Sequence, residues 1–281
     1  MKWKGRRTSS NVQDRRGMGA SRGVVGGGIG TIVIALIIFF LGGDPSVLLN
    51  DNSFVQPSAP SEYVQSEEEN ELYEFASVVL AETETVWDNL FEEQGLKYEY
   101  PQLIIYNESV QSACGPATSQ VGPFYCPGDN SVYIDLSFYE DLKKDFNAPG
   151  DFAFAYVIAH EVGHHVQNQL GISEQVMSLR GKMSEAEFNK YMVRLELQAD
   201  YFAGVWAHYV ERANLLERGD IQEALNAASG VGDDRIQSEA WGYVVPDKFT
   251  HGTSEQRMRW FNKGFESGTI EDGNTFEAKE L

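Results

Sequence analysis

The segment His160-Glu161-Val162-Gly163-His164 constrains this chain of 281 residues more than any other feature. Apolar residues surround it, so it is predicted to lie in a buried helix within residues 150–171. Residues four apart on a helix share a face, so the imidazoles of His160 and His164 can hold one zinc ion. Glu161 lies beside the first ligand, where its carboxylate can act as general base toward a water on the metal.

A structural interpretation of the same motif remains open. Two core histidines with ring nitrogens satisfied by neighbours would give the same apolar setting. His165 points about a hundred degrees away from His164 on a helix, so it is predicted to lie off the metal. His208 has no motif partner and is predicted to be structural.

A third zinc ligand is expected downstream, because a catalytic zinc usually has three protein ligands and one open position. Residues 194–204 form a second apolar helical pattern, in which Glu196 and Asp200 share a face. A carboxylate among aliphatic neighbours is costly to bury unless it is paired or metal-bound. We predict Glu196 as zinc ligand and Asp200 as acceptor for a ring N–H of one ligand histidine. The alternative is a solvent-facing acidic stripe that pairs with Arg194 or Arg212.

Together the two helices resemble those of glutamate-liganded zinc peptidases, in which H-E-x-x-H is followed by E-x-x-x-D on a second helix. More narrowly, the chain resembles the neutral zinc metallopeptidase family of bacterial single-span membrane proteins. Three further stretches carry the resemblance, namely residues 3–17, 114–127 and 250–257. The resemblance covers most of the chain apart from the linker and the last residues. It implies a hydrolytic reaction that uses one Zn²⁺, and it leaves the substrate open.

The stretch 250–257 contains the last candidate residues. A turn that carries His251 leads into a helix with a T-x-x-Q capping box at Thr253 and Gln256. A zinc peptidase benefits from a donor directed at the oxyanion that forms during attack. We predict His251 as this catalytic donor and Arg257 as its electrostatic support behind the site. The alternative is a surface histidine and a solvated arginine.

An apolar stretch near the N-terminus predicts membrane attachment. Residues 23–43 carry no charge, and about twenty apolar residues can cross a bilayer as a helix. Seven basic residues and one acid precede this stretch, which predicts a cytoplasmic N-terminus and a periplasmic or extracellular domain. A cleaved signal peptide is the alternative, but no A-x-A-like site follows the stretch.

These features divide the chain into four predicted parts. Residues 1–22 are a basic cytoplasmic tail, 23–43 a transmembrane helix, 44–69 a flexible linker and 70–281 a zinc metallopeptidase domain. The formal net charge is −20, and the predicted tail contributes +6, so the remainder carries −26. Phosphate backbones repel such an acidic domain, which excludes nucleic acid as a partner.

The two cysteines, Cys114 and Cys126, both follow the predicted span, and disulfides persist in the compartment beyond it. A bridge between them would hold a short, turn-rich loop and contribute on the order of 3 kcal/mol by loop-closure entropy. Two independent thiols are the alternative.

The predicted fold class is α+β and zincin-like, with a small twisted sheet packed on helices and the metal between the two motif helices. Strands are expected over 102–106, around 124–126 and over 131–135, and helices over 71–93, 136–146, 221–228 and 254–263. Residues 124–134 are either a platform for an added peptide strand or an ordinary core hairpin.

The predicted function is therefore that of a membrane-anchored zinc-dependent endopeptidase with protein or peptide substrates. One alternative is a non-catalytic anchored protein whose metal site holds a binding domain together. Another is a zinc hydrolase that cleaves a non-peptide amide. An intact Glu161 favours catalysis, because structural zinc needs no general base and normally has four protein ligands.

Overall fold

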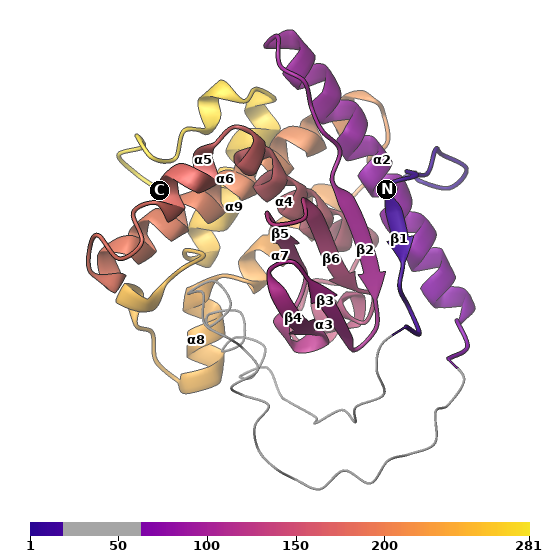
Figure 1. The fold of residues 1–281 in the computed structure, drawn as a ribbon, viewed down its shortest axis with the longest axis horizontal. Coiled ribbons are helices and arrows are strands. Elements are labelled where there is room, and N and C mark those ends of the chain that lie inside the picture. The colour runs from indigo at the N-terminus through magenta and orange to yellow at the C-terminus, as the bar shows by residue number, and fades with distance from the viewer. Residues whose placement is uncertain (19–62) are drawn as a thin grey trace, which may run out of the picture.

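The computed structural model describes residues 1–18 and 63–281 (Figure 1). The fold is α+β, as predicted, with a small mixed sheet packed on helices. The predicted transmembrane helix over 23–43 and most of the predicted linker lie outside the described residues. Within the described ranges, none of the helices has the length and apolar character needed to cross a bilayer.

The main sheet has the strand order β1-β2-β6-β5. Its strands are β1 (Val12–Asp14), β2 (Gln102–Tyr106), β6 (Ser131–Asp135) and β5 (Phe124–Cys126). The first three run parallel, and β5 runs antiparallel to β6 at the edge. Neighbouring side chains alternate between two buried clusters, because successive residues of a strand face opposite sides of a sheet. Leu103 and Ile105 join the main core, whereas Ile104 and Tyr106 join a smaller cluster on the other face.

A hairpin of β3 (Ser109–Ser112) and β4 (Gly115–Thr118) contributes to the smaller cluster. A short 3-10 helix, η2 (Ser119–Val121), connects it to β5. Cys114 lies in the hairpin turn and is bonded to Cys126 at the end of β5. The predicted disulfide is thus confirmed, and it fastens the hairpin turn to the edge strand.

The helices make up the rest of the domain. They are α2 (Glu67–Glu93), α3 (Phe138–Lys144), α4 (Asp151–Gln169), α5 (Ile172–Met177), α6 (Glu185–Arg212), α7 (Asp220–Gly230), α8 (Asp233–Trp241) and α9 (Ser254–Ser267), with 3-10 turns η3 (Pro246–Lys248) and η4 (Glu271–Gly273). Capping boxes begin α2 at Ser66 and α6 at Ser184, and the predicted box begins α9 at Thr253. Each box satisfies backbone N–H groups that would otherwise lack partners at a helix start.

Two glycine contacts bring the helices of the site together. A Cβ at Gly163 of α4 would lie 2.9 Å from the carbonyl oxygen of Ala199 on α6. A Cβ at Gly264 of α9 would collide with the carbonyl oxygen of Tyr201, also on α6. The helix backbones approach this closely because glycine has no side chain. As a result, side chains of α4 and α9 reach those of α6.

The N-terminal region differs from the predicted division of the chain. Residues 1–18 pack on the domain and supply β1, whereas a separate tail over 1–22 was expected. Trp3 is buried against Phe75, with ring centroids 5.5 Å apart. The folded region after the linker begins with Ser66, the cap of α2, and thus before residue 70. A strand of three residues is too short to give a hydrophobic pattern, so the sequence of this segment indicates only its basic character.

Candidate metal centre

Three predicted ligands meet between α4 and α6. His160 and His164 project from α4, and Glu196 projects from α6. Nε2 of His160 lies 3.2 Å from Oε2 of Glu196, and Nε2 of His164 lies 3.5 Å from Oε1. Ligand atoms about 2.0–2.1 Å from a tetrahedral zinc are separated by roughly 3.3 Å, so the spacing fits one ion.

The lack of hydrogen-bond partners for several buried atoms of this cluster also fits a bound metal ion. Within the described part of the chain, no hydrogen-bond partner reaches Oε2 of Glu161, and Nε2 of His164 and Oε1 of Glu196 have only each other at 3.5 Å. Buried polar atoms are nearly always paired, because an unpaired one loses its hydration without compensation. Two histidines and one carboxylate are a ligand set of catalytic zinc sites. The orphaned atoms and the donor set therefore suit one Zn²⁺ with an open position.

The outer nitrogen of His160 faces a buried charged group. Nδ1 of His160 lies 2.9 Å from Oδ1 of Asp200. Arg257 of α9 donates to both oxygens of Asp200, at 2.8 and 2.9 Å, and the Tyr156 hydroxyl donates to Oδ1 as well. This arrangement directs Nε2 of His160 toward Glu196 and compensates the buried Asp200 carboxylate with a guanidinium.

Burial and neighbouring charges shift the pKa values in this group. Burial alone would raise the pKa of Asp200, but Arg257 and His160 outweigh it and lower that pKa to about 2. Burial alone would lower the pKa of His160, but the Asp200 charge and its hydrogen bond raise it to about 9. Without metal, His160 therefore holds a proton that zinc must displace on binding.

The outer nitrogen of His164 faces a neutral group that we did not predict. Oε1 of Gln167 lies 2.9 Å from Nδ1 of His164. Nε2 of Gln167 donates to the carbonyl oxygen of Leu195 at 2.7 Å and to the Gln198 amide at 3.1 Å. Gln198 in turn donates to the carbonyl oxygen of Gly273. The helical spacing of His164 and Gln167 was visible in the sequence, but only the buried amide network shows that this glutamine serves the ligand.

Gln167→Leu should weaken zinc binding by about 10- to 100-fold, the usual effect of losing an outer hydrogen bond to a ligand histidine. The leucine cannot accept from Nδ1 of His164, so the ring loses its fixed orientation. A competition titration against a chromophoric chelator would measure the affinity. Gln175→Leu on α5 is the matched control, since Gln175 is exposed and should leave the affinity unchanged. Equal zinc affinities of the two variants would contradict the role of Gln167.

Glu161 lies next to His160 in the sequence and is buried with it. Burial raises the pKa of its carboxyl, and this effect exceeds the opposing influence of His160 and His164. A carboxylate with a raised pKa is a better proton acceptor than an exposed one. Its unpaired oxygen and raised pKa suit the predicted general base.

Asp233 at the start of α8 fixes the loop that carries His251. One oxygen of Asp233 accepts hydrogen bonds from the backbone N–H groups of residues 250–252, and the other lies 3.2 Å from Nδ1 of His251. Burial would lower the pKa of His251, but the charges of Glu196 and Asp233 raise it. The sequence predicts Arg257 as the support of His251. In the structure Asp233 contacts the His251 ring, and Arg257 binds Asp200 behind His160.

The remaining histidines have other partners. His165 contacts the Tyr125 hydroxyl of β5 and the carbonyl oxygen of Glu99, and burial lowers its pKa to about 4. A neutral His165 therefore joins α4 to the edge strand. His208 pairs through Nδ1 with the carbonyl oxygen of Phe265. Neither belongs to the cluster of His160, His164 and Glu196.

Comparison with known proteins agrees with this geometry. A family model described as "Putative neutral zinc metallopeptidase" matches residues 1–276. The uncharacterized protein YpfJ of Escherichia coli strain K12 is 47% identical over 285 residues, which cover 98% of this chain and 99% of YpfJ. The uncharacterized protein Rv2575 of Mycobacterium tuberculosis is 42% identical over 195 residues, which cover 66% of this chain and 65% of the relative. No solved structure matches the chain. The chain therefore belongs to the neutral zinc metallopeptidase family.

Proposed function

We propose that this chain is a zinc-dependent endopeptidase that hydrolyses peptide bonds with Glu161 as general base. The observation that carries the proposal is the buried convergence of His160, His164 and Glu196 beside an unpaired Glu161 oxygen. A purely structural zinc would normally have four protein ligands and no such neighbour.

In the proposed hydrolysis each of these side chains has a separate role. When zinc is bound, it acts as a Lewis acid that polarises the scissile carbonyl and lowers the pKa of water. Glu161 accepts the proton of the attacking water and later delivers it to the departing amine. His251, oriented by Asp233, donates a hydrogen bond to the oxyanion.

The edge strand β5 supports a peptide as substrate. It is the outer strand of the main sheet beside β6, and Tyr125 in its centre contacts His165 of the motif helix. An extended peptide can add to such an edge through backbone hydrogen bonds, which align the amide without reading much sequence. The Cys114–Cys126 bond fixes one end of this strand.

We also propose that the domain works on the non-cytoplasmic side and associates with the membrane through residues 23–43. The disulfide supports the compartment, since such bonds persist in oxidising surroundings. The apolar composition of residues 23–43 supports the association.

Glu196→Ala should abolish stoichiometric zinc binding and hydrolysis together, because two histidines alone leave the metal without its carboxylate ligand. Metal analysis of the purified protein, with cleavage of an unfolded protein substrate measured in parallel, would test this. Glu174→Ala on α5 is the matched control, since Glu174 is exposed and lies outside the cluster. Full zinc occupancy in Glu196→Ala would show that the third ligand is misassigned. A zinc-loaded wild-type protein without peptidase activity would contradict the proposed reaction.

A further inference from the structure

We infer that residues 1–18 are an integral part of the metallopeptidase domain and lie on the same side of the membrane as its metal centre. The membrane side of a basic N-terminal segment is usually read from its charge. Here the backbone pairs, hydrogen bonds and ion pairs of that segment indicate instead that it lies beside the domain. These contacts do not depend on the proposed reaction.

Backbone pairing is the first support. β1 lies parallel to β2 in the register Val12 to Leu103, Gln13 to Ile104 and Asp14 to Ile105. The Leu103 N–H also donates to the carbonyl oxygen of Asn11, and the Arg15 N–H donates to that of Ile105. Without residues 1–18, β2 would expose the backbone groups that these bonds now satisfy.

A buried carboxylate on α2 is the second support. Glu84 is 2% exposed, and one of its oxygens accepts from Nδ2 of Asn11 at 2.7 Å and from the Ser9 hydroxyl. The other oxygen accepts from Arg7 at 2.9 Å. These partners all come from the N-terminal segment. A buried carboxylate is strongly unfavourable without such partners, and the N-terminal segment supplies these three to Glu84.

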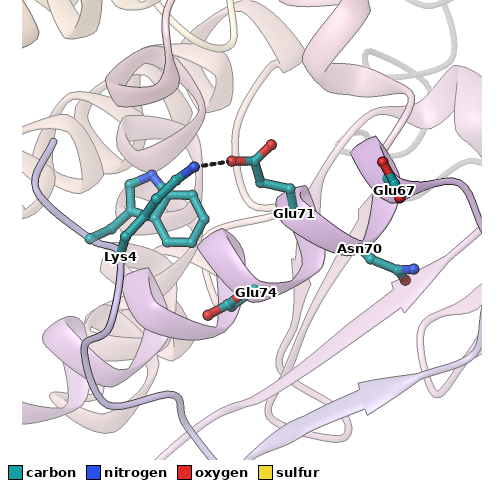
Figure 2. A pocket seen from close by; sticks show the side chains of 6 residues that line it. Lys4, Glu67, Asn70, Glu71 and Glu74 are labelled. Carbon is teal, nitrogen blue, oxygen red and sulfur yellow. Dashed lines mark ion pairs between the residues drawn. The ribbon is translucent and has the colours of Figure 1, made fainter.

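The basic residues of the segment are also engaged by the domain. Arg6 pairs with Glu82, and Lys4 pairs with Glu71. Figure 2 shows Lys4 reaching Glu71 across a pocket of about 410 Å³ at the junction between the segment and α2. Arg16 is buried, pairs with Asp14 and donates to the carbonyl oxygen of Glu69. The basic residues Lys4 and Arg6, which in the sequence resemble a signal for membrane orientation, thus pair with acidic residues of α2.

The described residues on the two sides of 19–62 lie close to each other. A Cβ at Gly17 would lie 2.7 Å from the Tyr63 ring, and the Gln65 amide donates to Asp14 at 3.3 Å. The described residues on either side of 19–62 are therefore in contact. Residues 1–18 and the part of the domain around residue 63 therefore lie side by side, which places both on one side of any membrane.

Crosslinking of the full-length protein in membranes would test the inference. The side chains of Gln13 and Gln102 are 3.3 Å apart, and the native cysteines are already bonded to each other. In Gln13→Cys/Gln102→Cys, a short bifunctional maleimide should join the two positions. Cyanogen bromide cleaves after Met18 and Met177, so a crosslink should cause loss of the free peptide 2–18 and its attachment to fragment 19–177.

The matched control is Gln13→Cys/Gln175→Cys, whose second cysteine lies in the same fragment. Gln175 lies on α5, on the opposite side of the domain from β1 (Figure 1), so the free peptide should remain. An impermeant maleimide applied to intact spheroplasts should also label the single-cysteine variants Gln13→Cys and Gln175→Cys to the same extent. No crosslink in the first pair, or labelling of only one single-cysteine variant before lysis, would overturn the inference. Both results are independent of peptidase activity.

Discussion

Glu161→Gln should lower the turnover number by about 10² to 10⁴-fold, the usual contribution of a positioned general base. Glutamine has nearly the same shape as glutamate but cannot accept the proton of the attacking water. Glu161 does not belong to the cluster of three ligands, so zinc content should stay at the wild-type level. The loss should appear mainly in turnover, because the proton is transferred in the transition state.

The measurement is steady-state hydrolysis of an unfolded protein by zinc-loaded enzyme, with metal content determined on the same sample. Glu174→Gln on α5 provides a matched exchange at an exposed position and should retain full activity. Wild-type turnover in Glu161→Gln would rule out this carboxylate as the base. Loss of zinc from the variant would instead assign Glu161 to metal binding.

Arg257→Met should destabilise the zinc-free domain by about 3–5 kcal/mol, the usual cost of removing one partner of a buried ion pair. The side chains of Arg257 and Asp200 are 4% and 0% exposed, so water cannot replace the lost guanidinium. Arg257 also donates to the Tyr156 hydroxyl and to the carbonyl oxygen of Val231, so the variant removes these hydrogen bonds from the core as well. Urea denaturation would give the change in the free energy of unfolding.

Arg259→Met is the control for this prediction. Arg259 lies on the same helix and pairs with the exposed Glu255, and such surface pairs contribute about 0–1 kcal/mol. Arg257→Met/Asp200→Leu should recover part of the lost stability, because the buried carboxylate that has lost its guanidinium is removed as well. Equal stabilities of the Arg257 and Arg259 single variants would show that the Asp200 pair contributes little.

Much of the candidate metal centre could be predicted from the sequence, because the spacing of its two histidines is local. The H-E-x-x-H spacing on a helix fixes the relative positions of His160 and His164, whatever the rest of the fold does. Glu196 required a second helix to be placed against the first, and its apolar setting indicated that this helix would be buried. The strands β2 and β6 were predicted with their observed bounds, because each is a short apolar run beside turn residues.

Other parts of the site depended on contacts between residues far apart in the chain. Asp233 precedes His251 by eighteen positions, and no periodicity connects an aspartate at one helix start with a histidine in a loop before another. Arg257 was placed near the site, but its partner Asp200 follows from the close packing of α6 and α9 at glycines. Long-range packing of this kind leaves no local pattern in the sequence.

The sequence by itself determined the relative positions of the candidate zinc ligands His160 and His164 and of Glu161 beside them, because these positions are properties of one helical turn. Only the tertiary structure decided the role of the N-terminal segment. Basic residues before an apolar stretch have the same composition whether they orient a membrane span or, like Lys4, Arg6 and Arg7, pair with acids of a helix. The two cases differ in where the partners lie, and Glu84 is more than seventy residues away in the chain from Arg7 and Asn11. Charge and hydrophobicity are local quantities, whereas burial of a carboxylate under a distant segment exists only in the folded chain.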